Sequence, residues 1–466
     1  MQIPTDLYEY QKEDYKRILD TDGSFLVLSE MGTGKTPTAL AVSELGSWEG
    51  KTLIVCPRTL QLEWARQILD WCGFEASVAR KSCYRRLETL FSDFIGGKDS
   101  PYFIINYESF ATKRHLDVLK HYPFGLVVLD EAHKLKNPDT KRTKGMFEFL
   151  SARPDVKVLP MTGSPIVNNP MDLLTLLRIV RPKDYNIRGI KWAFLDNYCR
   201  YERGRYGVKV YGSKNLDLLR KQTASFTIRR TKKEVLPYLP EKYYRKVVVE
   251  MPEEQRGLYD QMKNEMMILL DNGEPLYAPG VLAALTRLRQ LSIDPRLLGA
   301  DKPSAKTEFI LDFLEEDGGK TVVFSCFESY VRILSKSLSE MGIKHVTITG
   351  GKALEERAAA VKQFQEDEDT QVVLGTVQTM GEGLTLTAAS NCIFSDRWWS
   401  PAVNSQAEDR LHRIGQKNAV QIVIPMCERS IDQSLDRILT SKKGMAEEYL
   451  GDRQIMKEVV DDLRQT

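Results

Sequence analysis

The sequence predicts an α/β protein with two doubly wound parallel sheets and a mainly helical insertion between them. Short apolar, β-branched strands alternate with helical segments through residues 25–181 and again through residues 304–436. Strands that alternate with helices indicate parallel sheets, whose functional residues gather at the carboxyl ends of the strands. Residues 182–300 lack this alternation and contain expected helices at 215–225 and 254–271. A chain of 466 residues is also too long for a single core.

The composition is that of a globular protein and excludes several other classes. The chain has 66 Lys and Arg against 64 Asp and Glu, so any nucleic acid must be bound through local patches. The seven cysteines are scattered and include no Cys-x-x-Cys pair, which argues for a reducing compartment and against structural zinc. No segment reaches the roughly 20 apolar residues of a membrane span, and the N-terminus lacks a signal peptide. We expect a cytoplasmic protein, or a nuclear one in a eukaryote, that is neither secreted nor in a membrane.

The first strand, at 25–28, runs into the glycine-rich segment SEMGTGKT at 29–36 and then into a helix. This arrangement aims backbone N–H groups and the positive end of a helix dipole at one point, which suits a triphosphate. Ser29 departs from the first Gly of the Gly-x-x-x-x-Gly-Lys-[Ser/Thr] pattern, and a Gly-Lys-Thr triplet also occurs by chance in turns. We predict that ATP is bound here, that Lys35 reaches the β- and γ-phosphates and that the Thr36 hydroxyl ligates Mg²⁺. The ATP-binding residues of the loop are Gly32, Thr33, Gly34, Lys35 and Thr36.

A pair of carboxylates follows the apolar strand at 126–129. A carboxylate directly after a buried strand is the expected second Mg²⁺ anchor in a chain with a phosphate loop, so Asp130 is assigned to the metal. Glu131 is placed to orient or deprotonate the attacking water. The structural alternative is an acidic helix N-terminus that the helix dipole stabilises.

Two further residues are candidates for the ATP site. Thr162 follows the strand at 156–160 and could hydrogen-bond the carboxylate pair, although residues of this kind also form turns. Gln11 lies upstream of the phosphate loop and could read an adenine edge, because an amide donates and accepts at once. A surface glutamine is the simpler interpretation of Gln11.

Polar residues at the ends of other strands are candidates for nucleic-acid binding. They can offer hydroxyl, amide and guanidinium groups to a phosphate backbone, although plain strand-to-helix turns are the alternative. The predicted contacts are Arg58, Thr59, Asn106, Tyr107, Ser325 and Thr376. The last two of these lie at the ends of strands in the second strand–helix series, at residues 304–436.

Two arginines lie in the segment QAEDRLHRIGQ at 406–416. On a helix, Gln406, Arg410 and Arg413 would share one face. Two guanidinium groups on one face repel unless they meet an anion, and the γ-phosphate of ATP is such an anion. We therefore predict that Arg410 and Arg413 are catalytic arginine fingers of the second lobe and that Gln406 belongs to the ATP-binding residues. Pairing of these arginines with Glu408 and Asp409 is the structural alternative.

The insertion contains two features of open meaning. The basic run RRTKK at 229–233, followed by LPEK at 239–242, can bind phosphates or carboxylates of the ATP-binding lobe, or it can be a solvated helix end. The Tyr and Trp residues at 185–211 could stack on bases, but aromatic residues in helical segments more often belong to the core.

In order and spacing, these motifs resemble the Swi/Snf remodeller type of superfamily-two ATPase over residues 11 to about 436. The resemblance implies two RecA-like lobes that close on ATP, and ATP-driven translocation along duplex DNA. The sequence departs from the family pattern at Ser29, Met380, Thr385 and Ser400, which leaves the phosphate and Mg²⁺ chemistry intact. The motifs are Gln11, SEMGTGKT, LIVCPRTLQLEW, INYESF, LDEAHKLKNPDTKRTK, MTGSPIVNNPMDLLTLLRIVRP, the RRTKK and LPEK pair, and QAEDRLHRIGQ.

On this basis we expect four segments: an ATP-binding RecA-like lobe at 1–181, a helical protrusion and linker at 182–300, a second RecA-like lobe at 301–436, and a C-terminal helical tail at 437–466. We expect a compact monomeric motor without accessory domains that binds duplex or branched DNA with little sequence specificity. The alternatives are a strand-separating or annealing helicase on DNA or RNA, and an ATP-controlled nucleic-acid-binding switch with little turnover.

Overall fold

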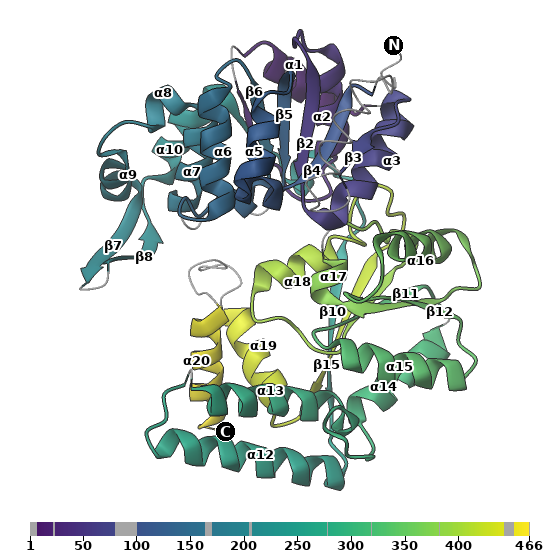
Figure 1. The fold of residues 1–466 in the computed structure, drawn as a ribbon. Coiled ribbons are helices and arrows are strands. Elements are labelled where there is room, and N and C mark those ends of the chain that lie inside the picture. Colours follow the sequence, from purple (N-terminus) through teal and green to yellow (C-terminus); the bar gives the residue numbers. More distant parts are fainter. Residues whose placement is uncertain are drawn as a thin grey trace. The chain divides into compact units, whose positions relative to one another are not determined.

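A computed structural model describes residues 7–21, 24–79, 100–163, 170–204, 207–276, 278–317, 319–381, 383–441 and 452–465. The chain divides into two compact units, Met1–Pro237 and Tyr238–Thr466, each of which contains one parallel sheet (Figure 1). Two parallel sheets with helices between successive strands confirm the predicted fold class.

The first unit contains a seven-stranded sheet in the order β3-β4-β2-β5-β6-β1-β9. All its paired strands are parallel. Every residue of β5 is buried, which explains why this strand is a continuous apolar run up to Asp130. The strands are β1 (Leu26–Val27), β2 (Lys51–Cys56), β3 (Ser77–Val78), β4 (Tyr102–Asn106), β5 (Phe124–Asp130), β6 (Lys157–Met161) and β9 (Thr227–Ile228).

The helices of the first unit follow its strands, as the βαβ pattern predicts, and continue into the insertion. They are α1 (Glu9–Leu19), α2 (Lys35–Leu45), α3 (Gln61–Cys72), α5 (Lys113–Lys120), α6 (Lys141–Ala152), α7 (Pro170–Val180), α8 (Pro182–Tyr185), α9 (Ile190–Tyr198), α10 (Leu216–Thr223) and α11 (Lys232–Val235). A separate antiparallel hairpin, β7 (Cys199–Gly204) and β8 (Gly207–Ser213), projects away from the sheet of this unit (Figure 1).

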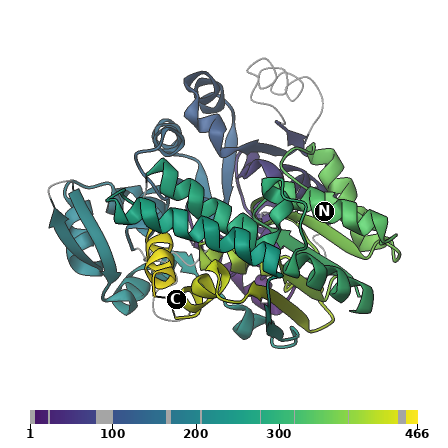
Figure 2. The same cartoon turned by 90° about the horizontal axis from the view of Figure 1, so that it is seen from below.

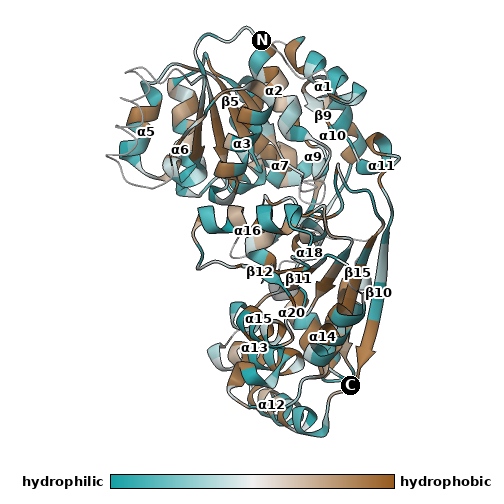
Figure 3. Ribbon diagram, turned by 90° about the vertical axis from the view of Figure 1, so that its right-hand side faces the viewer, coloured by the Kyte–Doolittle hydropathy of each residue, from teal (hydrophilic) through white to brown (hydrophobic). Residues whose placement is uncertain are grey.

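The second unit contains a six-stranded parallel sheet in the order β10-β15-β14-β11-β13-β12. The interior strands β11 and β15 are hydrophobic along their length, whereas the edge strand β10 is hydrophilic in its first half (Figure 3). The strands are β10 (Lys242–Val249), β11 (Thr321–Ser325), β12 (His345–Ile348), β13 (Val372–Thr376), β14 (Asn391–Phe394) and β15 (Val420–Cys427).

Two groups of helices complete the second unit. One group follows the strands of the sheet: α14 (Ala305–Asp317), α15 (Glu328–Glu340), α16 (Leu354–Glu366), α17 (Val377–Met380) and α18 (Pro401–Glu408). The other group shares a core of its own that includes Tyr259, Leu285, Leu435 and Val459. This group comprises α12 (Glu253–Asp271), α13 (Pro279–Ile293), α19 (Ile431–Ser441) and α20 (Asp452–Leu463).

The segment predicted as an insertion is divided between the two units. The helices expected at 215–225 and 254–271 occur as α10 and α12, but residues 199–213 form the hairpin. Strand β9 pairs with β1 in the first sheet, whereas β10 pairs with β15 in the second. The two units therefore meet in sequence at Pro237 and Tyr238, inside the predicted 182–300 segment. Within the described ranges, no helix combines the length and apolarity that crossing a membrane requires.

Candidate active site

The phosphate loop has the backbone that the glycine pattern predicts. Gly32 has φ 77° and Gly34 has φ 70°, values that favour glycine, and Gly34 is the N-cap of α2. Lys35 and Thr36 are the first two residues of that helix, so the loop N–H groups and the helix dipole meet at one place. The local sequence therefore builds an anion-binding turn.

Helix α1 supports the loop from one side. Gln11 Nε2 donates to the Gly34 carbonyl at 3.0 Å, and the Tyr10 hydroxyl donates to the Thr33 carbonyl at 2.9 Å. The Gln11 side chain is only 2% exposed, so it is not a surface glutamine. Its Oε1 accepts the Tyr8 N–H, which leaves the adenine contact of Gln11 a prediction.

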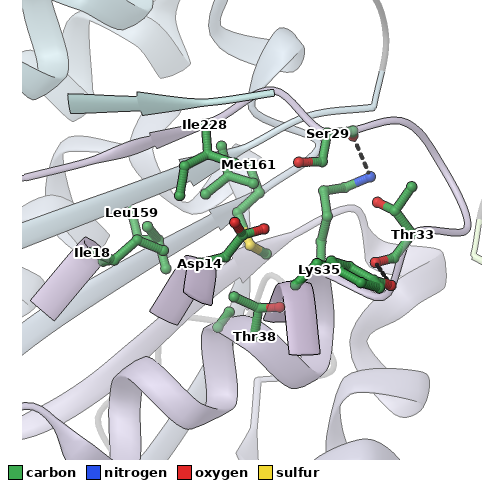
Figure 4. A pocket seen from close by; sticks show the side chains of 12 residues that line it. Asp14, Ile18, Ser29, Thr33, Lys35, Thr38, Leu159, Met161 and Ile228 are labelled. Atoms are coloured by element: carbon green, nitrogen blue, oxygen red, sulfur yellow. Dashed lines mark hydrogen bonds between the residues drawn. The ribbon is translucent and has the colours of Figure 1, made fainter. Parts of the chain in front are cut away.

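The Lys35 ammonium lies over the loop backbone. Lys35 Nζ donates to the carbonyl of Ser29 at 3.0 Å (Figure 4). It also donates to the carbonyl of Glu30 at 2.9 Å. A Cβ atom at Gly163 would lie 2.9 Å from Lys35 Nζ and 2.5 Å from Met31 Cγ, so the end of β6 approaches the loop closely because residue 163 is glycine. Beside the loop lies a pocket lined by Asp14, Ser29, Lys35, Met161 and Ile228, among others (Figure 4).

The basic run at 229–233 packs against the same loop. Glu30 N–H donates to the Arg230 carbonyl at 2.9 Å, and Lys232 N–H donates to the Glu30 carboxylate at 2.8 Å. Arg230 donates twice to Asp14 Oδ1, at 3.0 and 2.7 Å. Burial raises the pKa of Asp14, and the hydrogen bond from Arg230 opposes this rise. We expected the basic run to bind either phosphates or carboxylates of the ATP-binding lobe. Arg230 binds such a carboxylate, that of Asp14.

Asp130 ends strand β5 and is 9% exposed. Its Oδ2 accepts the Trp64 indole N–H at 2.8 Å, and its Oδ1 accepts the Glu131 N–H at 3.0 Å. Burial and the charge of Glu131 raise the pKa of Asp130 to about 6, while Trp64 and Lys35 oppose the rise. The Asp130 carboxylate and the Thr36 hydroxyl are oxygen donors of the kind that Mg²⁺ prefers, so the residues present fit this ion.

Glu131 has a strained backbone and a buried side chain. Its φ of 53° is unusual for a residue other than glycine. Glu131 is also buried, with 8% of its surface exposed. His133 Nδ1 lies 3.3 Å from Glu131 Oε2 and 3.2 Å from Thr162 Oγ1. Thr162, which was predicted to hydrogen-bond the carboxylate pair, therefore reaches it through His133.

Trp64 and His133 are site residues that the sequence reasoning missed. His133 belongs to the Asp-Glu-Ala-His run, so its position in the motif was a usable signal. Trp64 lies on α3, 66 residues before Asp130, and no spacing rule connects the two.

The predicted nucleic-acid residues of the first unit differ in accessibility. Arg58 is exposed and Thr59 is partly exposed at the end of β2, as a backbone contact requires. Asn106 is partly exposed, and its Oδ1 accepts the Ser109 hydroxyl at 3.3 Å. Tyr107 is 2% exposed and donates its hydroxyl to the Asp130 carbonyl at 2.6 Å. The side chain of Tyr107 therefore supports the carboxylate site, and its burial contradicts a surface contact.

The two predicted contacts of the second unit are also buried. Ser325 is 1% exposed and donates to Asp396 Oδ1 at 2.8 Å. Thr376 is the N-cap of α17, and its hydroxyl accepts the Thr379 N–H at 3.3 Å. Both hydroxyls are used inside the second unit, which contradicts their predicted exposure to a phosphate backbone.

Arg410 and Arg413 lie in a turn that follows α18. The helix ends at Glu408, and short-range bonds from the Arg410 N–H to Ala407 and from the Leu411 N–H to Glu408 replace the α-helical pattern. The expectation that Gln406, Arg410 and Arg413 share a helical face is therefore wrong. We call residues 409–413 the arginine turn; Arg413 within it donates to Thr385 Oγ1 at 3.0 Å.

Strand β10 and the residues before it hold the arginine turn. Lys242 Nζ lies 3.1 Å from Glu408 Oε2 and 2.9 Å from Asp409 Oδ1, and the Tyr244 hydroxyl donates to Glu408 at 2.8 Å. Burial would lower the pKa of Lys242, but Asp409 and Glu408 outweigh it and the pKa is raised. His412 Nε2 lies 2.6 Å from the Pro240 carbonyl. The carboxylates suggested as partners of the arginines thus bind the Lys of LPEK.

Residues 14–297 match the family described as the SNF2-related domain, and residues 305–415 match the helicase conserved C-terminal domain. This chain belongs to the SNF2-related family. The two domains of the SNF2-related family and of the helicase C-terminal region thus lie in the order that the motifs predicted, and the resemblance found from these motifs is confirmed.

Curated relatives cover nearly all of this SNF2-related chain. The human DNA annealing helicase and endonuclease ZRANB3 is 27% identical, over 96% of this chain and 41% of the relative. A second relative is the Xenopus tropicalis SWI/SNF-related matrix-associated actin-dependent regulator of chromatin subfamily A-like protein 1. It is 27% identical, over 94% of this chain and 44% of the relative. An uncharacterized ATP-dependent helicase of Mycoplasma genitalium is 25% identical, over 95% of this chain and 42% of the relative. The chain thus spans less than half the length of each of these relatives.

Among solved structures, the Sulfolobus solfataricus SWI2/SNF2 ATPase core in complex with dsDNA aligns over 100% of this chain and 99% of that chain. The two are 22% identical, with a TM-score of 0.43.

Proposed function

We propose that this protein hydrolyses ATP to move along duplex DNA with little sequence specificity, and that it remodels protein–DNA complexes or branched DNA. The observation that carries the proposal is that the phosphate loop with Lys35 follows β1, and the Asp130–Glu131 pair follows β5, in one parallel sheet of an SNF2-related chain. Lys35 lowers the pKa of Asp130, so the phosphate loop and the carboxylate pair act on one another. A cation for phosphates beside a carboxylate for a metal is the donor set that phosphoryl transfer needs.

The first unit supplies most of the chemistry. The loop N–H groups and Lys35 would hold the triphosphate, and Thr36 and Asp130 would hold Mg²⁺. Bound Mg²⁺ supplies charge neutralisation at the phosphate oxygens. Glu131 orients the attacking water and accepts its proton, while His133 positions Glu131 relative to Thr162. Tyr107 holds the backbone carbonyl of Asp130, and Trp64 holds its carboxylate.

The second unit supplies positive charge at the γ-phosphate. Arg410 and Arg413 act as arginine fingers when the two units close on ATP, with Gln406 beside them. Lys242 is a positioning residue, because it holds Glu408 and Asp409 at the base of the arginine turn. Hydrolysis then requires both units, and alternate closing and opening moves two sets of DNA contacts past one another.

DNA is favoured as the track by the name of a relative, the human DNA annealing helicase and endonuclease, and the preference for duplex DNA comes from the resemblance to Swi/Snf-type ATPases. Arg58, Thr59 and Asn106 remain the contacts of the first unit, because their side chains reach the surface. Contacts of this kind go to phosphates and sugars and carry little sequence information. The buried Ser325 and Thr376 leave the side-chain contacts of the second unit to other residues.

Steady-state ATP hydrolysis tests the proposal. Turnover is measured with no nucleic acid and with blunt duplex DNA, single-stranded DNA or RNA, at two salt concentrations because phosphate binding depends on salt. We expect the strongest stimulation by duplex DNA, together with displacement of a triplex-forming strand without unwinding of the duplex. Stimulation by single strands or RNA alone, with displacement of a paired strand, would establish the helicase alternative instead.

The substitution Glu131→Gln separates an enzyme from an ATP-controlled switch. We expect ATP binding to remain and hydrolysis to fall by about 10²- to 10⁴-fold, the usual contribution of a general base. Binding is followed with a fluorescent ATP analogue and turnover by phosphate release. An unchanged rate would show that Glu131 is not the base, and negligible wild-type turnover would support the switch.

A further inference from the structure

The hairpin β7–β8 and the start of α9 form an exposed surface that the ATPase mechanism does not use. The hairpin extends away from the sheet of the first unit in both views (Figures 1 and 2). We use the name hairpin platform for the exposed or partly exposed residues Trp192, Arg200, Tyr201, Arg203, Tyr211 and Lys214. Arg203 contacts Trp192 and Tyr201, whereas Arg200 lies on the other face of β7.

Positive charge is concentrated in the segment that carries the platform. Residues 182–221 contain ten Lys and Arg against four Asp and Glu, whereas the whole chain is nearly balanced at 66 against 64. Arg200, Arg203 and Lys214 are all exposed. The platform is therefore a local basic patch of the kind that a near-neutral protein needs to bind a polyanion.

The aromatic residues of this segment divide into two groups. Phe194 and Tyr198 of α9 are buried, so the core interpretation holds for them. Trp192 on the same helix is 43% exposed, and Tyr211 on β8 is 52% exposed. Large aromatic side chains beside exposed cations, outside any core, suit stacking on bases.

The cations and the aromatic rings are organised together. Arg203 Cζ lies 4.5 Å from the centre of the Trp192 ring and 5.8 Å from that of Tyr201, and Arg203 Nη2 donates to the Tyr201 hydroxyl at 3.3 Å. A Cβ atom at Gly212 would lie 3.2 Å from Cβ and Cδ of Arg200, so the glycine leaves room for the Arg200 side chain. The guanidinium of Arg203 is thus held at the surface instead of moving freely.

We propose that the hairpin platform binds single-stranded nucleic acid, as in the unpaired arm of a branched DNA. The arginines and Lys214 contact phosphates, and Trp192 and Tyr211 stack on unpaired bases, whose faces are closed to them in a duplex. The inference rests on the proposed action on DNA and adds a preference for branched over blunt substrates. The surface residues Arg58, Thr59 and Asn106 are left to contact the duplex.

Fluorescence anisotropy of the full chain tests this site. The probes are a labelled fork with one single-stranded arm, a blunt duplex of the same length and a single-stranded oligonucleotide, each at two salt concentrations. For Trp192→Ala and Arg203→Glu we expect affinity for the fork and the single strand to fall about tenfold, in line with base stacking and phosphate contacts. Affinity for the blunt duplex should change less than about twofold, since duplex bases offer no free face.

Two further variants exclude trivial causes. Trp192→Phe keeps a ring and should retain most of the fork affinity, whereas a general loss of folding would not be rescued in this way. Arg220→Glu changes an exposed arginine of α10 that pairs with Asp217 at 2.9 Å, and it should bind the fork like the wild type.

Other results overturn the inference. Equal losses on fork and blunt duplex, an equal loss in Arg220→Glu, or unchanged fork binding in both platform variants would each show that the platform has no single-strand role. If the wild-type protein binds the duplex and the platform variants bind the fork as tightly as the wild type does, the platform inference fails but the proposed function stands. If the wild-type protein binds none of the three probes, the platform inference and the proposed function are both contradicted.

Discussion

The residues around Asp130 show how single side chains tune the ATP site. Burial and Glu131 raise the pKa of Asp130 to about 6, and the Trp64 indole opposes the rise by donating to the carboxylate at 2.8 Å. As the proposed Mg²⁺ ligand, Asp130 must be ionised. We therefore expect activity to fall as the pH drops through the pKa of Asp130 in the folded protein.

Replacing Trp64 by Phe removes the indole N–H and keeps an aromatic ring in the core. Because the lost hydrogen bond favours the ionised carboxylate, the pKa of Asp130 rises further. We expect kcat at neutral pH to fall about tenfold or more, as for a hydrogen bond to a charged group. The acid limb of the kcat/KM profile, which reports the free protein, should move to higher pH, and turnover measured between about pH 5.5 and pH 8.5 will show the change.

Trp71→Phe is the matched control for this prediction. Trp71 also lies on α3, but its indole donates to Gln67 on the same helix. The acid limb of the pH–rate profile of Trp71→Phe should therefore stay where it is in the wild type. Identical pH profiles for the two variants would contradict the role of Trp64.

At the scale of elements, ion pairs connect strands and helices that are distant in sequence. Lys242 on β10 joins the arginine turn, and Lys306 on α14 joins α19 through Asp432 at 2.6 Å. The contacts of Lys242 hold the residues at the start of the arginine turn, whereas the Lys306–Asp432 pair lies in the interior of the second unit.

Lys242→Met should disturb the arginine turn. It leaves Glu408 and Asp409 without their shared cation, so we expect kcat to fall about tenfold while the KM for ATP changes little, as for a residue that acts on the transition state. Lys242→Arg should restore part of the rate. Steady-state kinetics with saturating DNA measures both parameters.

Lys246→Met provides the control on the same strand. Lys246 pairs with Asp436 at 2.8 Å, and Asp436 keeps Arg397 at 2.7 Å after the substitution. Its kcat should stay near the wild-type value. An equal loss in both variants would show that β10, and not Lys242 itself, determines the rate.

Lys306→Met should destabilise the second unit. Lys306 is completely buried, and its ammonium also donates to the Ser395 carbonyl at 2.9 Å. Removing it leaves Asp432, whose side chain is 12% exposed, without its cation, and we expect a loss of up to about 3–5 kcal/mol in the free energy of unfolding. Urea unfolding will report the change.

Lys302→Met serves for comparison, because its ammonium pairs with Glu254 at the surface. Its urea midpoint should match that of the wild type. A wild-type midpoint for Lys306→Met as well would mean that the interior pair contributes nothing.

At the scale of the whole molecule, the proposed reaction needs groups from both units. The phosphate loop and the carboxylate pair lie in residues 1–237, and the arginine turn lies in residues 238–466. Residues that bind ATP and residues that complete its hydrolysis should therefore respond differently to substitution.

Arg410→Ala should retain ATP binding and lose most of the DNA-stimulated turnover, on the order of a thousandfold by analogy with arginine fingers. A binding assay with a fluorescent ATP analogue and a phosphate-release assay separate the two effects. Arg332→Ala, which removes an exposed arginine of α15 paired with Glu328, should behave like the wild type. Normal turnover in Arg410→Ala would exclude the two-unit site.

Local patterns in the sequence determined both parallel sheets, the phosphate loop, the carboxylate pair and the family. These features depend on neighbouring residues: an apolar run before Asp130, glycines at 32 and 34, and a lysine that begins a helix. The sequence also located the basic run at 229–233, with a carboxylate of the ATP-binding lobe as one of its two expected partners.

Only the tertiary structure decided which way individual side chains turn. It directs Tyr107 and Ser325 inward, ends α18 before Arg410, and divides the predicted insertion between two sheets. The physical reason is distance along the chain: Trp64 meets Asp130 across 66 residues, and Lys242 meets Glu408 across 166. Such contacts depend on how elements pack, which no local spacing encodes.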